Sequence, residues 1–191
     1  MRFRILTGKQ ITEDRFQEFI DLDHTTWPEG DPAFLPTDYL RSLYPDNYEG
    51  LFLAVDPDTD RMAGSFNTIF TDEDSFRQYL NGSFTDLKPV RKGKDRRMIL
   101  YLYAADLYPQ YRGSSCMKEL GKAFAAWLDG LEDEGYRFED VWCETVSADG
   151  VRTALHGFGM TPVHTDEQGI GYWHNGDALR GYRRKMREMA L

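Results

Sequence analysis

A strand, a tight turn and a long amphipathic helix follow one another over residues 98–134, and this succession limits the possible folds more than any other segment. Met98–Leu107 is rich in isoleucine, leucine and tyrosine, which predicts a buried strand. Gly113 or Ser114 then opens a helix whose apolar residues recur at helical spacing: Leu120, Phe124, Trp127, Leu128 and Leu131. We expect Gly135 to end this helix in the C′ position.

Strand and helix patterns alternate along the rest of the chain. Further strands are expected at residues 2–6, 51–55, 61–70, 138–145, 160–164 and 169–174. Further helices are expected after the N-cap Thr12, over 38–43, 74–80 and 149–158, and in the tail from Asp177. This order of elements predicts an α/β or α+β domain with a central mixed sheet.

The composition excludes several classes of protein. With 191 residues, 41% of them apolar, the chain is long enough for one domain with a sizeable core. A net charge of −9 argues against nucleic-acid binding, because phosphate contacts need a basic surface. No apolar run approaches the ~20 residues of a membrane span, and the first residues lack a signal-peptide core, so we expect a cytoplasmic protein. Cys116 and Cys143 are too few for a disulfide framework and stand at no zinc-site spacing.

One segment has the spacing of a calcium loop, with acids at Asp56, Asp58 and Asp60. Arg61 stands where such a loop has its invariant glycine, and Asn67 stands where it has its last glutamate. We therefore interpret the segment as a turn between two strands and expect no metal.

Charge is distributed unevenly, and each charged segment allows two interpretations. Residues 12–49 hold ten acidic residues and only two arginines. We interpret this segment either as a solvated face or as an acidic rim that attracts a cationic, amine-bearing substrate. Residues 88–97 are basic, as either a surface loop or a patch for cofactor phosphates. The tail from Asp177 is a basic amphipathic helix, for which a solvated terminal helix is the default.

The amino end of the helix after Met98–Leu107 is suited to an anion. A helix amino terminus offers unpaired N–H groups and a partial positive charge. Because the residues before it are small, the backbone can approach a pyrophosphate closely. A strand, turn and helix of this kind occur in many α/β folds, so the class must be identified from further residues.

Two short motifs make the chain resemble the GNAT superfamily of N-acyltransferases. Tyr108-Pro-Gln-Tyr-Arg-Gly113 is similar to the turn that opens the family's acyl-CoA pyrophosphate loop, and Gly157-Phe-Gly-Met-Thr-Pro-Val163 resembles the segment after its shorter helix. The order of elements over residues 1–175 also resembles that of the family. The resemblance implies one domain over residues 1–175, with a mixed, mostly antiparallel sheet flanked by helices, and a basic helix over residues 176–191.

The loop departs from the family's pattern, which is Arg/Gln-x-x-Gly-x-Gly/Ala. In one register it begins at Arg112, and Ser115 and Met117 replace both glycines; in the other it begins at Gln110, and Ser115 alone is changed. A serine hydroxyl can itself donate to a phosphate. The resemblance implies that the pyrophosphate is bound by Arg112, Gly113, Ser114, Ser115, Cys116 and Met117.

The resemblance also implies where the acyl-pantetheine arm of acetyl-CoA, or of another acyl-CoA, would lie. In the family the fourth and fifth strands splay apart and the arm occupies the gap. The backbone of Ala105, Asp106 and Leu107 would bind the pantetheine amide and the thioester oxygen, where a fixed donor stabilises the developing oxyanion. Ser147, after the fifth strand, would be a further polar contact to the arm.

Direct attack of an amine on a thioester needs a base and an acid, because an amine is mostly protonated at neutral pH. Glu144 and Asp106, near the ends of the fifth and fourth strands, are the candidate bases, acting directly or through water. The family often uses a tyrosine of the short helix as the acid, but Leu155 stands at that position. His156 beside it is the first substitute, and Tyr108 is the second.

The activity implied by the resemblance is transfer of an acetyl or other acyl group from CoA to a primary amine of a small molecule or peptide. A second interpretation is transfer of a long acyl chain from acyl-CoA or acyl carrier protein, which the many aromatic residues and the basic residues 88–97 would suit. A third is a catalytically degenerate module that senses CoA or binds a partner, as the altered loop and Leu155 suggest. Dimers are common in such folds, so a homodimer is compatible with each interpretation.

Overall fold

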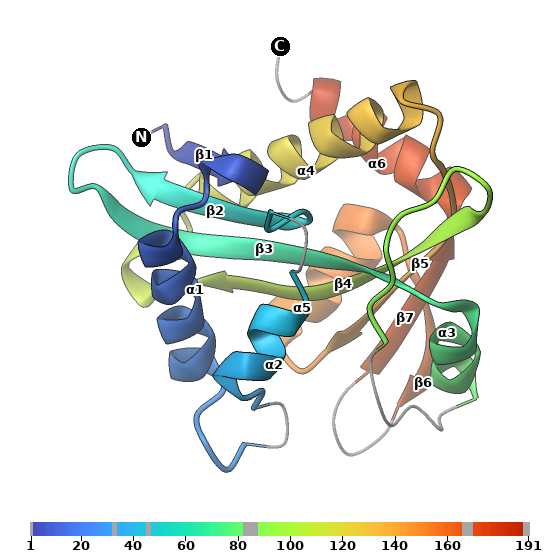
Figure 1. Ribbon diagram of the computed structural model, residues 1–191, viewed down its shortest axis with the longest axis horizontal. Helices are drawn as coiled ribbons and strands as arrows, with labels where there is room; N and C mark the ends of the chain where they lie inside the picture. Colours follow the sequence, from blue (N-terminus) through green and yellow to red (C-terminus); the bar gives the residue numbers. More distant parts are fainter. Residues whose placement is uncertain (1, 32–33, 45–46, 82–87, 166–169, 189–191) are drawn as a thin grey trace. The chain divides into compact units, whose positions relative to one another are not determined.

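A seven-stranded mixed sheet organises the computed structural model, which describes all residues except 1, 32–33, 45–46, 82–87, 166–169 and 189–191 (Figure 1). The strands are β1 (Arg4–Thr7), β2 (Leu51–Asp56), β3 (Arg61–Thr71), β4 (Arg97–Leu107), β5 (Arg137–Thr145), β6 (Thr161–Thr165) and β7 (Ile170–Asn175). The α-helices are α1 (Glu13–Thr26), α2 (Thr37–Ser42), α3 (Glu73–Leu80), α4 (Cys116–Asp133), α5 (Ala148–Arg152) and α6 (Gly176–Glu188). Two short 3₁₀ turns, η1 (Gly8–Gln10) and η2 (Pro109–Tyr111), and a π-helical turn, η3 (Thr153–Phe158), complete the described elements.

The strand order in the sheet is β1-β2-β3-β4-β5-β7-β6. β1 pairs with β2, β2 with β3, β5 with β7, and β6 with β7 in antiparallel fashion, whereas β4 and β5 are parallel. The β4–β5 pairing runs from Arg97↔Arg137 to Leu102↔Cys143. The fold is therefore α+β with a mixed sheet flanked by helices, which confirms the fold class predicted from the sequence.

The predicted order of strands and helices is confirmed, with small shifts of the boundaries. The largest shift concerns α4, which begins at Cys116 rather than at Gly113 or Ser114. Gly113 has a φ of +76°, outside the right-handed helical region, so the helix starts only after it. Gly135, with a φ of +97°, follows the end of the helix in the conformation expected of a C′ glycine.

The described chain divides into two compact units. Unit 1 contains Met1–Asn67 and Ala104–Phe124, and unit 2 contains Thr68–Tyr103 and Ala125–Leu191. Unit 1 therefore holds β1, β2, α1, α2, the first part of β3, the carboxyl end of β4 and the first half of α4. The domain limits expected from the sequence, 1–175 and 176–191, stay a prediction.

In unit 1 an aromatic cluster joins the sheet to the start of α4. Phe52 of β2 and Phe66 of β3 are cross-strand partners. The ring of Phe124 lies 5.9 Å from that of Phe52 and 4.9 Å from that of Phe66, measured between centroids. These side chains therefore mark the face of β2 and β3 that α4 covers.

Helix α1 is stabilised by a hydrogen-bonded cap at its amino end and by the burial of one face. The Thr12 side chain accepts a hydrogen bond from the N–H of Arg15, and Glu13 and Asp14 in the first turn complement the helix dipole. Its buried stripe consists of Phe16, Phe19, Ile20, Leu22 and Asp23. A carboxylate within such a stripe is unusual, because acidic side chains are rarely fully buried.

In unit 2 the core is built around Trp142, which is fully buried. Its ring centroid lies 4.1 Å from that of Tyr101 and 4.2 Å from that of Tyr79. Trp142 Nε1 donates to Thr71 Oγ1 at 3.3 Å, and the Tyr79 hydroxyl donates to the carbonyl of Cys143. The polar ends of the buried rings are thus satisfied inside the core.

Helix α6 is bound to the second half of α4 by ion pairs within unit 2. The guanidinium of Arg183, which is 4% exposed, lies 2.7 Å from the carboxylate of Glu132 and 3.3 Å from that of Asp129. Arg187 Nε donates to Asp129 Oδ2 at 2.9 Å. The expectation of a solvated basic helix is therefore wrong for Arg183, because a helix that buries a guanidinium needs acidic partners, and α4 supplies them.

Candidate active site

The loop after β4 is held by hydrogen bonds within unit 1. The N–H of Tyr108 donates to the carbonyl of Ala63 at 3.0 Å. The hydroxyl of Tyr111, at the end of η2, donates to Asp56 Oδ2 at 2.9 Å. Asp56 thus ties the β2–β3 turn to the loop, which fits the interpretation of its segment as a turn.

Small residues surround the amino end of α4. Arg112, Gly113 and Ser114 are exposed, and a Cβ added to Gly113 would meet no atom within 4 Å. The Ser114 hydroxyl donates to the carbonyl of Tyr111 at 2.6 Å and accepts from the N–H of Cys116 at 3.2 Å. The open backbone and the helix dipole here fit a pyrophosphate group.

Cys116 and Met117 form the first turn of α4 rather than the loop before it. The Cys116 side chain is buried, and burial raises the pKa of its thiol to about 12. The thiol is therefore protonated at neutral pH, which does not suit a nucleophile. Met117 and Ser115 are half-buried.

Asp106 is the most perturbed acid that the structure places near the loop. Its side chain is 9% exposed, and its Oδ2 has no hydrogen-bond partner among the described residues. Burial, and then repulsion from Asp23, raise the pKa of Asp106 to about 7, while Arg112 opposes the shift. A carboxyl group with such a pKa can exchange a proton at neutral pH, as a general base must.

Asp23 is the residue that sequence reasoning missed. It is fully buried on α1, and its negative charge acts on Asp106 of β4. An available clue was the position of this acid directly after Leu22, within the apolar stripe of the predicted helix. The stripe by itself could not reveal which strand residue the carboxylate faces.

The neighbours of Asp106 on β4 and in the loop differ in exposure. Ala105 is exposed, and Leu107 and Tyr108 are half-buried. Burial, followed by the charges of Asp21 and Glu18, raises the pKa of Tyr108. The Tyr108 hydroxyl therefore keeps its proton at neutral pH. The acidic side chains of α1 are close enough to Tyr108 to affect its pKa.

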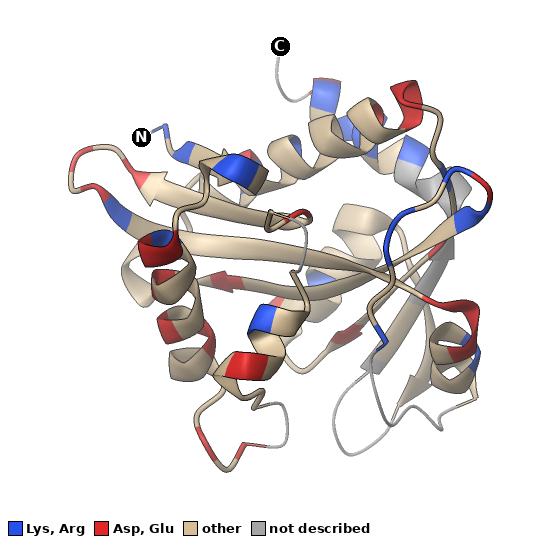
Figure 2. Cartoon of the chain, viewed as in Figure 1, with Lys and Arg blue, Asp and Glu red and all other residues tan. Residues whose placement is uncertain are grey.

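Acidic residues follow α1 along its length (Figure 2). Part of this charge is internally paired, since Arg15 lies 2.9 Å from Glu18 and Arg41 pairs with Glu13. Asp21 and Glu18 nevertheless act on Tyr108. Glu13 and Glu18 are thus paired at the surface, and the charge of α1 also reaches Tyr108 after β4. The interpretation of the segment as an acidic rim that attracts a cationic substrate stays a prediction.

Glu144 and Ser147 belong to unit 2. Glu144 is half-buried, one residue before the end of β5, and pairs with Gly171 of β7. Ser147 is the N-cap of α5, and its hydroxyl accepts from the N–H of Gly150 at 3.1 Å. The structure therefore assigns Ser147 a structural task, and its predicted contact to a pantetheine arm stays a prediction.

His156 lies in η3, a six-residue π-helical turn. Turns of this kind are rare and occur frequently at functional sites. The His156 side chain is exposed, and its carbonyl accepts from Lys185 Nζ at 2.9 Å. Leu155, where the family often has tyrosine, is half-buried.

Within unit 1 the structure thus brings together Asp106, Tyr108, the loop and the amino end of α4. Within unit 2 it holds Glu144, Ser147 and His156. The roles expected of these residues, and of Ala105 and Leu107, stay predictions.

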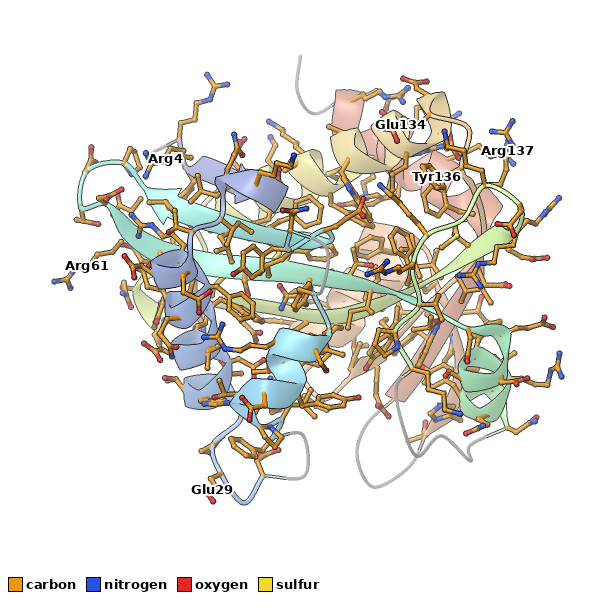
Figure 3. The ribbon with its side chains drawn as sticks, viewed as in Figure 1. Arg4, Glu29, Arg61, Glu134, Tyr136 and Arg137 are labelled. Atoms are coloured by element: carbon orange, nitrogen blue, oxygen red, sulfur yellow. The ribbon has the colours of Figure 1, made fainter. Side chains whose placement is uncertain are left out.

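The basic residues 88–97 belong to unit 2. Lys92 and Lys94 each hold Nζ 5.1 Å from the ring centroid of Tyr136. Tyr136 and Arg137 lie side by side at the amino end of β5 (Figure 3), where Arg137 is in register with Arg97 of β4. These contacts favour the surface-loop interpretation, and the alternative of a phosphate patch stays a prediction.

The described part of the chain offers neither a membrane-spanning helix nor a cluster of metal ligands. No described helix is long and apolar enough to cross a membrane. No group of three or more histidine, cysteine or acidic residues among the described residues could hold a metal ion.

No family model matches the sequence, and neither does any curated protein. Solved structures match by fold. A chain of the NatC complex bound to Gag peptide and CoA superimposes with a TM-score of 0.60 and 15% identity, covering 91% of this chain and 96% of that chain. The mosquito arylalkylamine N-acetyltransferase like 5b matches with a TM-score of 0.58 and 12% identity, covering 91% of this chain and 100% of that chain.

A bacterial structure agrees with these two. An acetyltransferase of the GNAT family from Staphylococcus aureus has a TM-score of 0.56 and 10% identity, covering 91% of this chain and 99% of that chain. The mixed sheet with its parallel β4–β5 pair is thus that of an N-acetyltransferase-type α+β fold. The chain has the GNAT fold.

Proposed function

We propose that the protein is a GNAT-type N-acyltransferase that transfers an acetyl group, or another acyl group, from acyl-CoA to a primary amine. The observation that carries the proposal is Asp106, a buried carboxyl group whose pKa is raised to about 7. It stands near the end of β4, ahead of the small-residue loop and the amino end of α4. The GNAT fold also supports the proposal, because a chain of the NatC complex, which was solved with CoA bound, has this fold.

The donor would be acetyl-CoA or another acyl-CoA, held mainly by backbone groups. Its pyrophosphate would bind at the loop and first turn of α4, through Arg112 and those N–H groups of residues 113–117 that do not already donate within the loop, as the N–H groups of Ser114 and Cys116 do. The open surface at Gly113 supports this assignment. The backbone of residues 105–107 would bind the pantetheine amide and the thioester oxygen.

Proton transfer is assigned first to two residues of unit 1. Asp106 accepts a proton from the ammonium group of the acceptor, which frees the nitrogen lone pair for attack. Tyr108, protonated at neutral pH, donates a proton to the departing thiolate. Glu144 and His156 are the second choices for base and acid.

The acceptor would be a cationic small molecule or a peptide amine. The net charge of −9 and the acids of α1 that act on Tyr108 support a cationic acceptor. A long acyl chain, or acyl carrier protein as the donor, remains the alternative for the other substrate.

Ligand-dependent stability tests the donor. The melting temperature is measured with acetyl-CoA, CoA, a long-chain acyl-CoA and buffer alone. A ligand at about 100 times its Kd should add about 2.7 kcal/mol to the stability of the protein. Absence of any shift with all three ligands would overturn CoA-dependent transfer, and a shift with the long chain alone would favour the alternative donor.

Release of free CoA thiol with a panel of amines tests the catalytic assignment. Asp106→Asn should keep the melting shift with acetyl-CoA but lose roughly 10²–10⁴-fold in rate, because it removes the base. Binding of CoA without turnover of any amine would instead point to a degenerate CoA-binding module. An Asp106→Asn enzyme as fast as the wild type would remove Asp106 from the mechanism.

A further inference from the structure

Buried polar side chains gather in unit 1 around α1, and we call this set the buried polar cluster. Its members are all 9% exposed or less: Asp23, Tyr44, Ser65, Asn67 and Asp106. The Tyr44 hydroxyl, Ser65 Oγ, both polar atoms of the Asn67 amide and Asp106 Oδ2 have no hydrogen-bond partner among the described residues. Buried polar groups in proteins nearly always have a partner, so such a set points to a functional site rather than to ordinary core packing.

The position of the cluster follows from the two faces of β3. Phe66 points to Phe124 of α4, so its neighbours Ser65 and Asn67 point to the opposite face. Within unit 1, helix α1 and the first half of α4 lie on opposite sides of β3 (Figure 1), and Asp23 belongs to the buried stripe of α1. Groups from the strand and the helix therefore enter the same layer.

Asp106 reaches this layer from the adjacent strand. β3 and β4 approach closely at Gly64, where an added Cβ would lie 2.4 Å from the Asp106 carbonyl oxygen. Asp106 thus stands beside the segment that carries Ser65. The contact at Gly64 places Asp106 beside β3, and Asp23 enters the same layer from the buried stripe of α1. Both carboxyl groups are buried, and the charge of Asp23 acts on Asp106, which together support an Asp23–Asp106 pair.

Tyr44 closes the cluster on the side of α2. Its ring centroid lies 6.2 Å from that of Phe16 and 6.0 Å from that of Phe19, both on α1. Burial, and in second place the negative charge of Asp23, raises the pKa of Tyr44, and the same two causes raise the pKa of Asp106. The charged and titratable groups that act on Asp106 are therefore Asp23 of α1 and, in the opposite sense, the exposed Arg112 of the loop.

We propose that Asp23 is a positioning residue for the reaction, an inference that rests on the proposed function: its buried carboxylate repels negative charge on Asp106 and so strengthens Asp106 as a base. When the acceptor binds, an N–H bond of its ammonium group breaks. The proton passes to a carboxylate oxygen of Asp106, and the electron pair stays on nitrogen for the attack. Arrival of the proton relieves the repulsion between the two carboxylates, which favours the transfer.

The titration of Asp106 tests this proposal without CoA or an amine. Side-chain carboxyl carbons of aspartate are followed by ¹³C NMR from pH 3 to pH 9, and Asp106→Asn assigns the Asp106 signal. The wild-type midpoint should lie at about 7. In Asp23→Asn it should fall by about one unit or more, a tenfold loss of proton affinity, because the like charge is removed.

Two variants control for changes of structure. Asp21→Asn removes a charge from the exposed side of the same helix and should leave the Asp106 midpoint unchanged. Asp23→Glu keeps the charge and should keep the midpoint raised. An unchanged midpoint in Asp23→Asn, or an equal fall in Asp21→Asn, would overturn the proposal.

Wild-type protein supplies a second measurement in case Asp23→Asn does not fold. The Asp23 carboxyl signal should itself respond at the Asp106 midpoint, because interacting groups titrate together. An Asp23 carboxyl chemical shift that does not change at the Asp106 midpoint would contradict the pairing of the two carboxylates.

The pH dependence of stability provides a check with a defined sign. Because folding raises the pKa of Asp106 from 3.8 to about 7, this group's stabilising effect is full below pH 3.8 and is lost as the pH rises through 7. In Asp23→Asn the loss should be smaller and occur at lower pH. If these titrations behave as expected but no amine is acylated, the proposed function fails while the carboxylate pair stands.

The effect on catalysis follows from the same charge. The acid limb of the kcat/KM profile should move to lower pH in Asp23→Asn, whereas Asp23→Glu should restore the wild-type profile. A merely structural role for Asp23 would lower the rate without moving the limb.

Discussion

Gly64 shows how a single residue controls the approach of two strands near the site. A Cβ at this position would lie 2.3 Å from Leu107 Cδ2 and 2.4 Å from the backbone oxygen of Asp106. Because the second neighbour is backbone, a change of rotamer cannot relieve the contact. The absence of a side chain at Gly64 therefore allows Asp106 to stand against β3.

We expect Gly64→Ala to lower the free energy of unfolding by about 1–3 kcal/mol, because β3 and β4 must move apart. Urea unfolding measures the effect. Gly130→Ala is the matched control: it lies in α4, and its added Cβ meets no atom within 4 Å. There alanine should raise stability by about 0.5–1 kcal/mol, since it favours a helix over glycine. Equal stabilities of wild type and Gly64→Ala would contradict the close contact.

At the scale of elements, α6 shows how a polar helix is anchored. Its sequence indicates a solvated basic helix, yet Arg183 is buried between Asp129 and Glu132 of α4. Tyr182 of α6 stacks on Phe158 at the end of η3, with 4.3 Å between the ring centroids. The helix is therefore bound by charge and by aromatic packing together.

Arg183→Met should destabilise the protein by about 2 kcal/mol. The methionine keeps apolar volume but takes the guanidinium away from Glu132 and Asp129, of which Asp129 keeps its contact with Arg187. Breaking the ion pair of a buried group is costly. Arg184→Met provides the control, because the Arg184 side chain is 80% exposed and its ion pair spans 4.0 Å. We expect the control to stay within about 0.5 kcal/mol of wild type in thermal unfolding. A loss no larger in Arg183→Met than in Arg184→Met would show that the ion pairs do not hold α6.

At the scale of the whole molecule, net charge decides which ligands are attracted from solution. The chain carries −9, with ten acids over residues 12–49. Such a field concentrates cations and repels anions over distances comparable with the Debye length. A cationic acceptor would thus be attracted, whereas an acyl-CoA would depend on local contacts at the loop and α4.

The proposed function therefore predicts a salt effect that differs between the substrates. With acetyl-CoA saturating, kcat/KM for a dicationic amine should fall several-fold between about 20 mM and 300 mM NaCl, because salt screens the attraction. A zwitterionic amine of similar size serves as the comparison and should respond much less. An equal response of both amines would exclude electrostatic attraction of the acceptor.

Much of the fold could be predicted because its determinants are local. The cap at Thr12, the apolar spacing of α4 and the turn after β2 each depend on residues a few positions apart. Those short-range patterns led to the element order and, through two motifs, to the GNAT resemblance that the solved structures support. The predicted start of α4 was wrong because glycine and serine occur in both loops and helices. Only the positive φ of Gly113, which is known from the structure, excludes Gly113 from the helix.

The candidate site was only partly predictable for the opposite reason. The sequence marked Asp106 and the loop as candidates, since the strand end and the motif that follows it lie in one contiguous stretch of the chain. The partner carboxylate Asp23 and the anchors of Arg183 come from distant segments, and no periodicity reveals which side chains meet across a core. Local spacing along the chain therefore determined the elements and their order, whereas burial and long-range charge, which exist only once the elements pack, decided the protonation of Asp106 and the anchoring of α6.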